Sequence, residues 1–504
     1  MMRLRFLAAV GMMALGLGGC GGPAPPPAVP ARPFLGTKLA VGVVGDPALL
    51  PSIKAQRGEW AARTGAELTV LDAPVDLKTI GDVDVLVFPG DRMGDLVDAG
   101  VLAALPDPAL DPPVPVSEGG GTTPFRDDLK FRDIILPYRE QVAKYGPARM
   151  ALPIGGSALV VAFRRAAFDD PATVEAAKAA GLTLGPPRTW EHFDAMARFF
   201  HGRDNDRDGR PESGVAVALG PDPEGVGDSI FLARAASSAL HRDQFSFLLD
   251  SDTTGPRVAS PPFVEALRAM VALKGYGPPG AEKFDAVAAR KAFRSGEAVF
   301  LIDRAERAGG WGVEGSPVGV APLPGSLRVF DPSRNAWEDL PEPNRPSYLP
   351  TGGGWLVGVV ATGRARAAAE DYAKYLAGPE STNRLRAEVG FPMLAVRSSQ
   401  LAQGMANPRS APGVEARPWA DAVARTLNSD RVAVGLRILG ATGYLADLSR
   451  ARVAAVGGEA PEKALAGLAK AWADRTRALG PARQTWHHRR SLNALATAPE
   501  PPPR

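Results

Sequence analysis

The chain has 504 residues, 45% of them hydrophobic and 22% charged, which is enough for two or three globular domains with large cores. Its formal net charge of +3 falls to +1 if the first 19 residues, which carry Arg3, Arg5 and no acidic residue, are removed. A near-neutral chain lacks the clustered positive charge that nucleic-acid binding requires. The one cysteine, Cys20, excludes disulfides within the chain.

The N-terminus has the pattern of an export signal. Two arginines precede an apolar run over residues 6–17, which is too short to span a bilayer as a helix. The Leu17-Gly18-Gly19-Cys20 segment resembles the lipobox of a bacterial lipoprotein signal, which implies cleavage before Cys20 and lipid on its sulfur. We therefore expect residues 1–19 to be a signal peptide and residues 20–35 to be the lipidated cysteine and a Pro-rich tether. The protein would then be extracytoplasmic and anchored to a membrane by lipid. The alternative, a buried thiol, conflicts with the Pro-rich segment that follows Cys20.

Three apolar segments early in the chain predict a parallel sheet covered by helices. Residues 38–44, 66–71 and 83–88 have the composition of buried strands, and the helical pattern after the first of them ends at Gly65. Ligands of such sheets bind beyond the carboxyl ends of the strands. The polar residues that follow the first and third strands are therefore candidate ligand contacts: Asp46, Asp91 and Arg92. The alternative is that they are surface loop charges.

An interrupted apolar run at residues 151–163 separates this unit from a second α/β unit. Two adjacent glycines, Gly155 and Gly156, mark a bend or a close approach. We expect this stretch to cross between two lobes, with the glycines as a hinge and with Gly156 and Ser157 beside a ligand. Valine at either glycine should then impair closure more than folding.

Later segments supply a helix, a strand and two tryptophans. Thr189 predicts the N-cap of a helix with an apolar stripe up to Phe200, and residues 298–302 predict a buried strand. Arg304 stands at the end of that strand, while Trp311 and Trp355 follow runs of glycine. Aromatic rings stack on sugars and glycines permit a ligand to approach, so these three residues are candidate contacts. Core packing is the alternative for each tryptophan. Residues 331–350 predict a polar loop, and residues 486–504 a disordered tail.

A short acidic segment matches the first half of a calcium-binding loop. Asp204, Asp206 and Asp208 take positions 1, 3 and 5, and Gly209 takes position 6. The carbonyl of Arg210 and the carboxylate of Glu212 fall at positions 7 and 9, but position 12 is valine. The alternative is a polar turn whose acids are neutralised by neighbouring arginines. We expect that the protein requires no cofactor. The segment either binds a structural Ca²⁺ or forms a polar turn.

Enzyme motifs are not found in the sequence. The histidines have no zinc-protease spacing, and the stretch after Gly155 fails the nucleophile-elbow pattern at Leu159. A hydrolase with two scattered carboxylates would leave no local motif and stays an alternative. We expect a protein that is not an enzyme.

Five stretches, in this order, resemble the family 1 extracellular solute-binding proteins of ABC importers. They are ALPIGGSALVVAF (151–163), PPRTWEHFDAMARFF (186–200), KAFRSGEAVFLI (291–302), VGVAPLPGS (318–326) and the segment 352–382. The resemblance spans most of residues 38–480. It implies an α/β, two-lobe periplasmic-binding-protein-like fold in which each lobe is a sheet flanked by helices and hinge strands join the lobes.

The resemblance also implies where the lobes begin and end. The first lobe would hold residues 36–152 plus 299–395, the second residues 153–298 plus 396–485, and a second crossing would run over residues 298–303. Tyr444 falls where the family often places an aromatic residue of the second lobe, which adds it to the candidate contacts.

The expected function is that of a lipid-anchored extracytoplasmic receptor. It would capture a small polar solute, most simply a carbohydrate, between its lobes and deliver it as a monomer to ABC permease subunits, without nucleic acid. The alternatives are a surface sensor or glycan-binding lipoprotein without a transporter and, from a different class, a hydrolase on the same scaffold.

Overall fold

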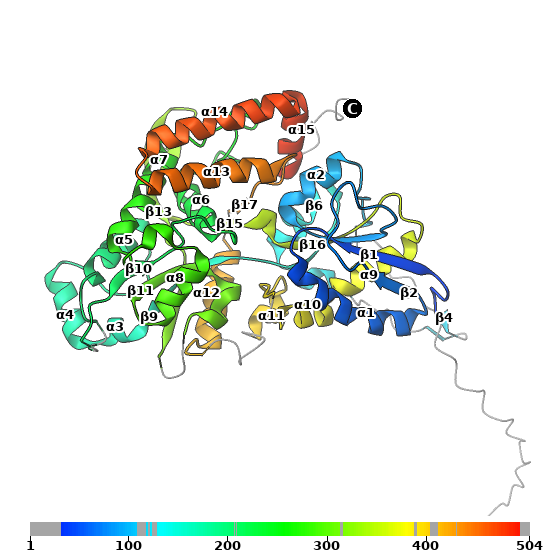
Figure 1. Cartoon of the computed structure of the whole chain (residues 1–504), viewed down its shortest axis with the longest axis horizontal. Coiled ribbons are helices and arrows are strands. Elements are labelled where there is room, and N and C mark those ends of the chain that lie inside the picture. The colour runs from blue at the N-terminus through cyan, green and yellow to red at the C-terminus, as the bar shows by residue number, and fades with distance from the viewer. Residues whose placement is uncertain are drawn as a thin grey trace, which may run out of the picture.

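The computed structural model consists of two α/β lobes side by side, with helices of the C-terminal part lying across one end (Figure 1). It describes residues 32–107, 117–118, 121–122, 129–205, 207, 209–312, 316–387, 391–403, 412–429 and 431–493. Within these residues no helix is long and apolar enough to cross a membrane. The expected signal peptide, Cys20 and most of the tether lie outside the described residues.

The first lobe is built on a five-stranded sheet with the order β2-β1-β3-β16-β8. Its three N-terminal strands pair in parallel, as the sequence predicts, and β16 runs antiparallel between β3 and β8. The strands are β1 (Lys38–Val43), β2 (Glu67–Val70), β3 (Val85–Pro89), β8 (Leu152–Gly155) and β16 (Trp355–Val359). The helices are α1 (Leu50–Thr64), α2 (Met93–Asp98), α9 (Arg366–Leu376), α10 (Pro379–Arg386) and α11 (Ser398–Ala402).

Helix α1 joins distant parts of this lobe. It ends at Gly65, whose φ of 78° is the left-handed conformation that glycine adopts at low cost. Trp60 of α1 is buried against Tyr372 of α9, and its indole Nε1 donates to Asp371 at 2.7 Å. A C-terminal segment of the sequence therefore completes the N-terminal sheet.

The second lobe is built on a four-stranded sheet with the order β10-β11-β9-β12. The strands are β9 (Leu159–Arg164), β10 (Ser213–Ala216), β11 (Ala298–Arg304) and β12 (Val318–Pro322). The helices are α3 (Arg165–Asp169), α4 (Pro171–Ala179), α5 (Trp190–Phe200), α6 (Val226–Ala239), α7 (Pro261–Ala272), α8 (Ala286–Arg294) and α12 (Ala416–Leu427). Side chains alternate along β9: Val160 and Ala162 join the core shared with the first lobe, while Val161 and Phe163 join a second core.

Helix α5 forms as its local pattern predicts. The Thr189 hydroxyl accepts from the amide of His192 at 3.2 Å and caps the helix. The predicted apolar stripe is buried, and its Phe193 packs against Phe300 of β11 with ring centroids 5.1 Å apart. The stripe thereby fixes α5 on the second sheet.

The second crossing lies further along the chain than the sequence analysis expects. We expected the first lobe to resume at residue 299, but β11 and β12 both pair with β9 in the second sheet. The apolar pattern of residues 298–302 is that of a strand buried on both faces, which periodicity alone cannot distinguish from a crossing strand. The first boundary moves too, because β8 keeps residues up to Gly155 in the first sheet.

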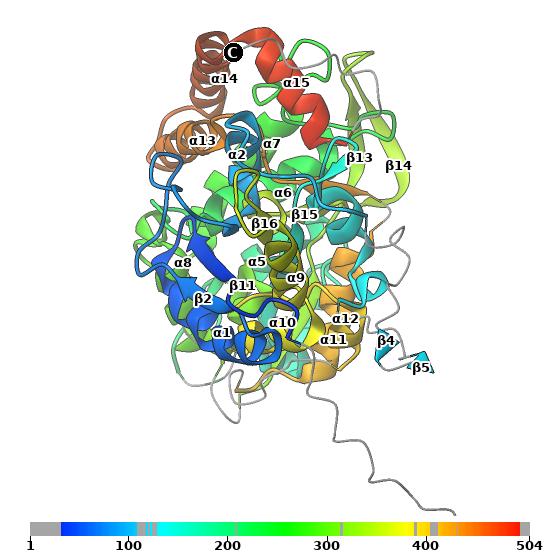
Figure 2. The ribbon, with the colours of Figure 1, turned by 90° about the vertical axis from the view of Figure 1, so that its right-hand side faces the viewer.

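The segment expected as a loop at residues 331–350 belongs to the second lobe. It contributes to a hairpin, β13 (Ser326–Asp331) and β14 (Ala336–Asn344), that packs on α6. In Figure 2, which faces the first lobe, this hairpin stands at the edge of the molecule. Beyond it, β15 (Ser347–Leu349) pairs with β17 (Val432–Val434), and only then does the chain return to the first sheet as β16.

The third boundary is also later than residue 395. Arg397 forms a bridge with Ile134, and Ser399 donates to Asp133, so these residues still belong to the first lobe. The next helix, α12, packs on β12 of the second lobe.

The C-terminal part ends in three helices, and one of them corrects the expected disordered tail. They are α13 (Ala441–Val456), α14 (Pro461–Leu479) and α15 (Pro481–Ser491). Trp486, His487 and His488 are buried, and His487 bonds to Asp98 of α2 through its imidazole. Helix α15 leaves α14 and packs against the first lobe near α2 (Figure 1). Residues 494–504 lie outside the described part.

The remaining elements are short strands and helical turns. The strands are β4 (Ser117–Glu118), β5 (Gly121–Thr122), β6 (Lys144–Tyr145) and β7 (Ala148–Arg149). The turns are η1 (Pro47–Leu49), η2 (Gly90–Arg92), η3 (Phe131–Asp133), η4 (Pro137–Val142), η5 (Leu273–Tyr276), η6 (Ala281–Lys283), η7 (Ala305–Gly310) and η8 (Thr351–Gly353).

Candidate functional site

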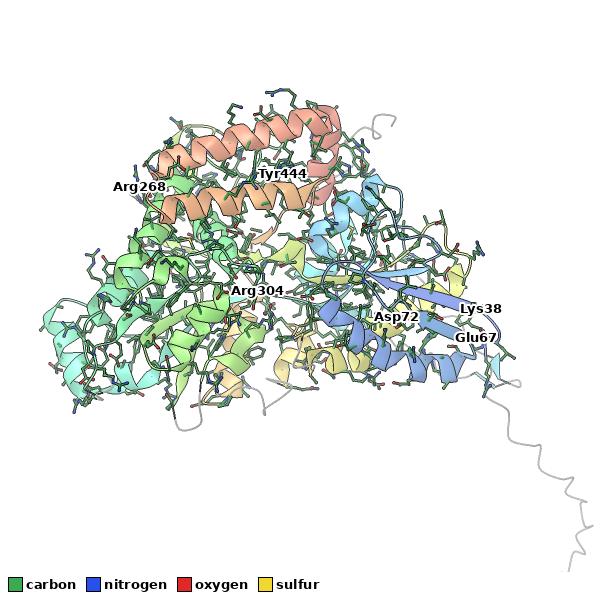
Figure 3. All side chains as sticks on the ribbon, viewed as in Figure 1. Lys38, Glu67, Asp72, Arg268, Arg304 and Tyr444 are labelled. Carbon is green, nitrogen blue, oxygen red and sulfur yellow. The ribbon has the colours of Figure 1, made fainter. Side chains whose placement is uncertain are left out.

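Polar residues from both lobes meet where the chain crosses between them. We call this group the crossing site, and it consists of Asp91, Ser157, Arg304, Glu306 and Thr351. Arg304 lies between the lobes in Figure 3. The backbone is joined at the same point, since the amide of Ala305 donates to the carbonyl of Ala158 at 2.8 Å.

The strand directions explain why these residues meet. Asp91 follows the carboxyl end of β3, and Trp355 at the start of antiparallel β16 is in register with Pro89, so both lie at one edge of the first sheet. Arg304 ends β11, which places it at the corresponding edge of the second sheet. Ser157 comes from the segment between β8 and β9. Asp91 and Arg304 therefore lie at the strand ends where the rule predicts ligand contacts.

The crossing segments approach each other through glycine. A Cβ atom on Gly156 would lie 2.2 Å from the Tyr138 hydroxyl, and one on Gly354 would lie 2.4 Å from the carbonyl oxygen of Gly155. Gly354 also has a φ of 116°, which L side chains rarely adopt. These glycines permit close backbone packing between the two crossing segments.

Glu306 follows β11 and is the second acid of the crossing site. Its Oε2 atom is buried and has no hydrogen-bond partner among the described residues. Burial raises the pKa of the Glu306 carboxyl, while the charge of Arg304 and the neighbouring Ser157 hydroxyl act against this. The phenol of Tyr138, which lies 3.5 Å from the Ser157 carbonyl, is fully buried beside the same group. A protonated carboxyl can donate a hydrogen bond to a polar ligand, and an ionised one can accept a hydrogen bond from it.

Asp91 has a similar environment on the side of the first lobe. Its Oδ1 atom is buried and has no partner within the described residues. Burial raises the pKa of Asp91 to about 6, and the charges of Arg92 and Arg304 limit the rise. A buried carboxyl oxygen without a partner costs free energy unless a ligand or water satisfies it.

Arg304 connects the second lobe to the crossing. One of its terminal nitrogens donates to the carbonyl of Glu224 at 2.6 Å and lies 3.4 Å from the Thr351 hydroxyl. Its Nε atom is buried and without a partner among the described residues. A guanidinium keeps its charge and offers several donors, so Arg304 can orient a ligand oxygen.

Trp311 does not face the site, in contrast to the expectation. It is completely buried and its indole donates to Asp303 at 2.9 Å. Asp303 also accepts from Arg290 at 2.8 Å, and Arg290 pairs with Glu224. Trp311 therefore packs in the core, which is the alternative given above. Its indole belongs to the network of Asp303, Arg290 and Glu224 next to Arg304.

Trp355 remains an accessible aromatic residue at this edge. It is partly exposed and meets Phe391 edge to face with centroids 5.2 Å apart. A Cβ atom on Gly45 would lie 3.5 Å from its ring, so the end of β1 is beside it. Asp46 is exposed there and accepts from the amide of Ala48 at 2.9 Å, which caps η1. The structure leaves Asp46 and Trp355 available for contact.

Two other candidates lie elsewhere. Arg92 donates to the Thr442 hydroxyl at 2.8 Å and thereby joins the first lobe to the start of α13. Tyr444 is fully buried between α13 and α14, where it hydrogen-bonds to Thr476 at 2.8 Å and packs on Trp472 (Figure 3). The sequence alone cannot distinguish a cleft aromatic from one that packs against a later helix.

The acidic segment is described only in part. Asp206 and Asp208 lie outside the described residues. Asp204 accepts from the amide of Gly209 at 3.1 Å, and Glu212 accepts from the amide of Asn205 at 2.7 Å. The described residues contain no group of three His, Cys, Asp or Glu side chains that could hold a metal ion. The predicted ligand at Arg210 is its backbone carbonyl, which is not among these side chains. The calcium site stays a prediction.

Sequence reasoning missed Glu306, Tyr138 and Thr351. Glu306 stands two residues after Arg304, which ends the predicted strand. The strand-end rule, applied to these next residues, would have predicted it. Tyr138 and Thr351 reach the site through packing of segments without a clear periodic pattern.

Two α/β lobes that are joined by crossing segments, with polar groups buried where they meet, define a two-lobe binding protein. A family model described as bacterial extracellular solute-binding protein matches residues 71–403. This match covers more than half of the chain, so the chain belongs to the bacterial extracellular solute-binding proteins. No match is found among curated proteins.

Solved structures confirm the two-lobe fold. The chain is similar to a solute-binding protein of an ABC transporter from Agrobacterium radiobacter K84 in complex with ribitol, with a TM-score of 0.58 and 20% identity over 89% of this chain and 100% of that chain. It is also similar to maltose-bound MalE3 of T. maritima, with a TM-score of 0.57 and 19% identity over 87% of this chain and 100% of that chain. A third similar structure is a solute-binding protein from Agrobacterium vitis S4 with bound D-mannitol. Its TM-score is 0.56, and the identity is 16% over 88% of this chain and 99% of that chain.

Proposed function

We propose that this chain captures a small polyhydroxylated solute, a sugar or a polyol, between its lobes at the crossing site. The observation that carries the proposal is the group of buried polar atoms there that have no partner among the described residues: Asp91 Oδ1, Arg304 Nε and Glu306 Oε2. Hydroxyl groups both donate and accept, so a polyol can satisfy two carboxyls and a guanidinium together. The ligands of the similar solved structures, ribitol, maltose and D-mannitol, have this chemistry.

Trp355 would supply the apolar contact of the same site. The carbon face of a sugar ring or polyol chain packs on an aromatic ring, and Trp355 is partly exposed beside Asp46. Contacts from both lobes form together only when the lobes are closed, so the solute would stabilise the closed state.

Calorimetric titration with ribitol, D-mannitol, maltose and maltotriose tests the proposal. We expect one of them to bind, and we expect Glu306→Gln and Trp355→Ala each to weaken that binding about tenfold or more. Asp72→Asn is the matched control, because Asp72 is exposed on the first lobe, away from Arg304 (Figure 3). Absence of binding across a wider sugar and polyol panel, or equal binding by all variants, would contradict the proposal.

We further propose delivery to an ABC importer and anchoring through lipid on Cys20. The family membership and the lipobox-like sequence support these steps. Metabolic labelling with a fatty acid should mark the wild-type chain and not Cys20→Ala, and transport of the bound solute should depend on a permease. Incubation with glycosides or esters should leave them unchanged, because we propose binding without turnover.

We retain a structural Ca²⁺ at the 204–212 segment as a proposal. Calcium should raise the melting temperature of the wild-type chain above its value in chelator, and Asp204→Asn should reduce that difference. An equal melting temperature in both conditions would favour the polar turn.

A further inference from the structure

A cavity lies apart from the crossing site. It has a volume of about 470 Å³, within the range of small-ligand pockets, and we call it the β17 pocket. Strand β17, residues 240–248, the end of η4 and the end of α15 surround it. None of the five crossing-site residues lines it, and Tyr348 of β15 packs against Phe247 of the pocket wall from the other side.

One wall of the pocket is an unpaired strand edge. In the two-stranded sheet, the amide of Ser347 donates to the carbonyl of Arg431, and the amide of Gly435 donates to the carbonyl of Leu349, both at 2.8 Å. Alternate residues of a strand direct their backbone groups to opposite edges, so those of Val432 and Val434 point away from β15. No backbone bond of these two residues is found within the described part of the chain. Both residues line the pocket.

The charged residues of the pocket wall are mostly basic. Arg242, Arg431 and Arg437 line it, whereas the acidic lining residue Glu140 already pairs with Lys144 at 2.6 Å. Arg242 is exposed and pairs with Glu338, but its guanidinium has donors to spare. Burial lowers the pKa of the Arg431 guanidinium, the charge of nearby Asp243 opposes this, and the charge of nearby Arg242 adds to it. Burial keeps His488 neutral at pH 7, so the positive charge comes from the arginines.

Aromatic side chains supply an apolar wall beside these charges. Phe245 is 83% exposed, the largest exposure among the large hydrophobic side chains described. Phe247, two residues further along the chain, is buried and lines the same pocket. An exposed phenylalanine at the mouth of a basic pocket is a contact for an apolar group of a ligand.

We propose that the β17 pocket binds a short acidic peptide in an extended conformation. The peptide backbone would pair with the outward groups of Val432 and Val434, as in other cases of strand addition. An apolar side chain would contact Phe245, and a carboxylate would pair with Arg242 and Arg431. Because the wall includes η4 of the first lobe and β17 of the second, such a peptide touches both lobes.

Calorimetry on the full chain with acetyl-Ala-Leu-Glu tests the proposal. We expect binding that weakens about tenfold or more for the uncharged acetyl-Ala-Leu-Gln amide and for a form N-methylated along its backbone. Phe245→Ser and Arg242→Gln should each weaken binding of the acidic peptide by a similar factor. Arg268→Gln is the matched control, since Arg268 is an equally exposed arginine of the second lobe that pairs with Glu462 and does not line the pocket.

Two outcomes would overturn the proposal. One is no binding of acetyl-Ala-Leu-Glu at millimolar concentration by the wild-type chain. The other is binding that Phe245→Ser and Arg242→Gln leave unchanged, which would place the peptide elsewhere. Glu306→Gln separates this proposal from the proposed solute site, because it should weaken solute binding and leave peptide binding unchanged.

Discussion

At two of the places where the lobes meet, the carboxyl groups differ in whether their oxygens have hydrogen-bond partners. In the crossing site, Asp91 and Glu306 each keep a buried oxygen without a partner among the described residues. At the other place, which we call the C-terminal junction, Asp98 of α2 accepts from Arg483 and His487 of α15. The amide of Gly440 donates to Asp95 at 2.7 Å in the same junction.

The difference separates a binding site from a structural joint. A carboxylate with two donors stabilises the contact that contains it, whereas a buried oxygen without a donor raises the free energy of the folded state. The C-terminal junction therefore holds the lobes together without a ligand. The crossing site is completed only when a polar molecule supplies the missing hydrogen bonds.

The largest expected effect breaks the C-terminal junction. Arg437 is fully buried and donates to the carbonyls of Val142 and Ser491. Arg437→Met leaves these carbonyls unsatisfied and should lower the free energy of unfolding by about 3–5 kcal/mol. Urea unfolding followed by circular dichroism measures it. Arg450→Met, at a 71% exposed side chain paired with Asp447, should cost less than about 1 kcal/mol, and equal losses would contradict a special role for the junction.

The next effect breaks the packing of the crossing segments. A Cβ atom on Gly156 would meet the hydroxyl of buried Tyr138 at 2.2 Å, so Gly156→Ala should destabilise the fold by about 2–3 kcal/mol. This reverses the expectation that valine at Gly155 or Gly156 impairs closure more than folding. Gly467→Ala on α14 is the control, because nothing lies within 4 Å of the added atom, and it should stabilise by about 0.5–1 kcal/mol. Thermal unfolding compares both, and an unchanged melting temperature for Gly156→Ala would restore the hinge expectation.

A third prediction concerns the pH dependence that the crossing site creates. The pKa of Asp91 is raised from 3.8 to about 6, so the folded state holds this proton where the unfolded state has lost it. Stability from this group is present below about pH 4 and is lost as the pH rises to about 6. Asp91→Asn removes that loss and should stabilise the chain by about 1–3 kcal/mol at pH 7.5, with no gain at pH 3.5.

Urea titrations of wild type and Asp91→Asn between pH 3.5 and 7.5 measure this difference. The buried His488, whose pKa is lowered to about 4, acts with the opposite sign in the same range, but it is common to both proteins and cancels. Asp72→Asn is the control at an exposed position; the hydrogen bond from Lys54 lowers the pKa of Asp72, so any change from this variant should be small and opposite in sign to that of Asp91→Asn. A constant difference at all pH values would show that Asp91 does not titrate as described.

The smallest expected effect tests whether Tyr444 has a structural role or contacts the solute. Tyr444→Phe removes only the hydrogen bond to Thr476 and should cost about 0.5–1.5 kcal/mol while solute affinity stays unchanged. Thr476→Val should cost a similar amount, and the double variant less than the sum, because both remove one bond. A loss of solute affinity in Tyr444→Phe would return this residue to the binding site.

Local patterns predicted those parts of the fold that local interactions determine. The strands of the first sheet and helix α5 follow from periodicity and from the cap at Thr189. The second crossing was misplaced, because the apolar run of β11 is compatible with either sheet and its partner β9 is distant in the sequence. The burial of Tyr444 has the same cause, since it depends on the later helix α14, whereas Trp311 is buried with its indole on nearby Asp303, a contact that has no periodic pattern.

The candidate site was predicted to a similar extent. The strand-end rule found Asp91 and Arg304, which the structure brings together with Ser157. Glu306 was missed because a buried carboxyl has no sequence signature until its neighbours are known. Arg92 was at the right edge of the sheet, but its side chain reaches Thr442 instead.

Helix α15 has a consequence for the order in which the molecule is completed. Synthesis proceeds from the N-terminus, yet the surface of the first lobe around Asp98 and Tyr145 is contacted by α15, which is made much later and whose His487 bonds to both residues. The first lobe to emerge is thus the last to be finished. Docking of α15 on the first lobe must therefore wait until this helix has been synthesised, by which time the residues of both sheets are already present.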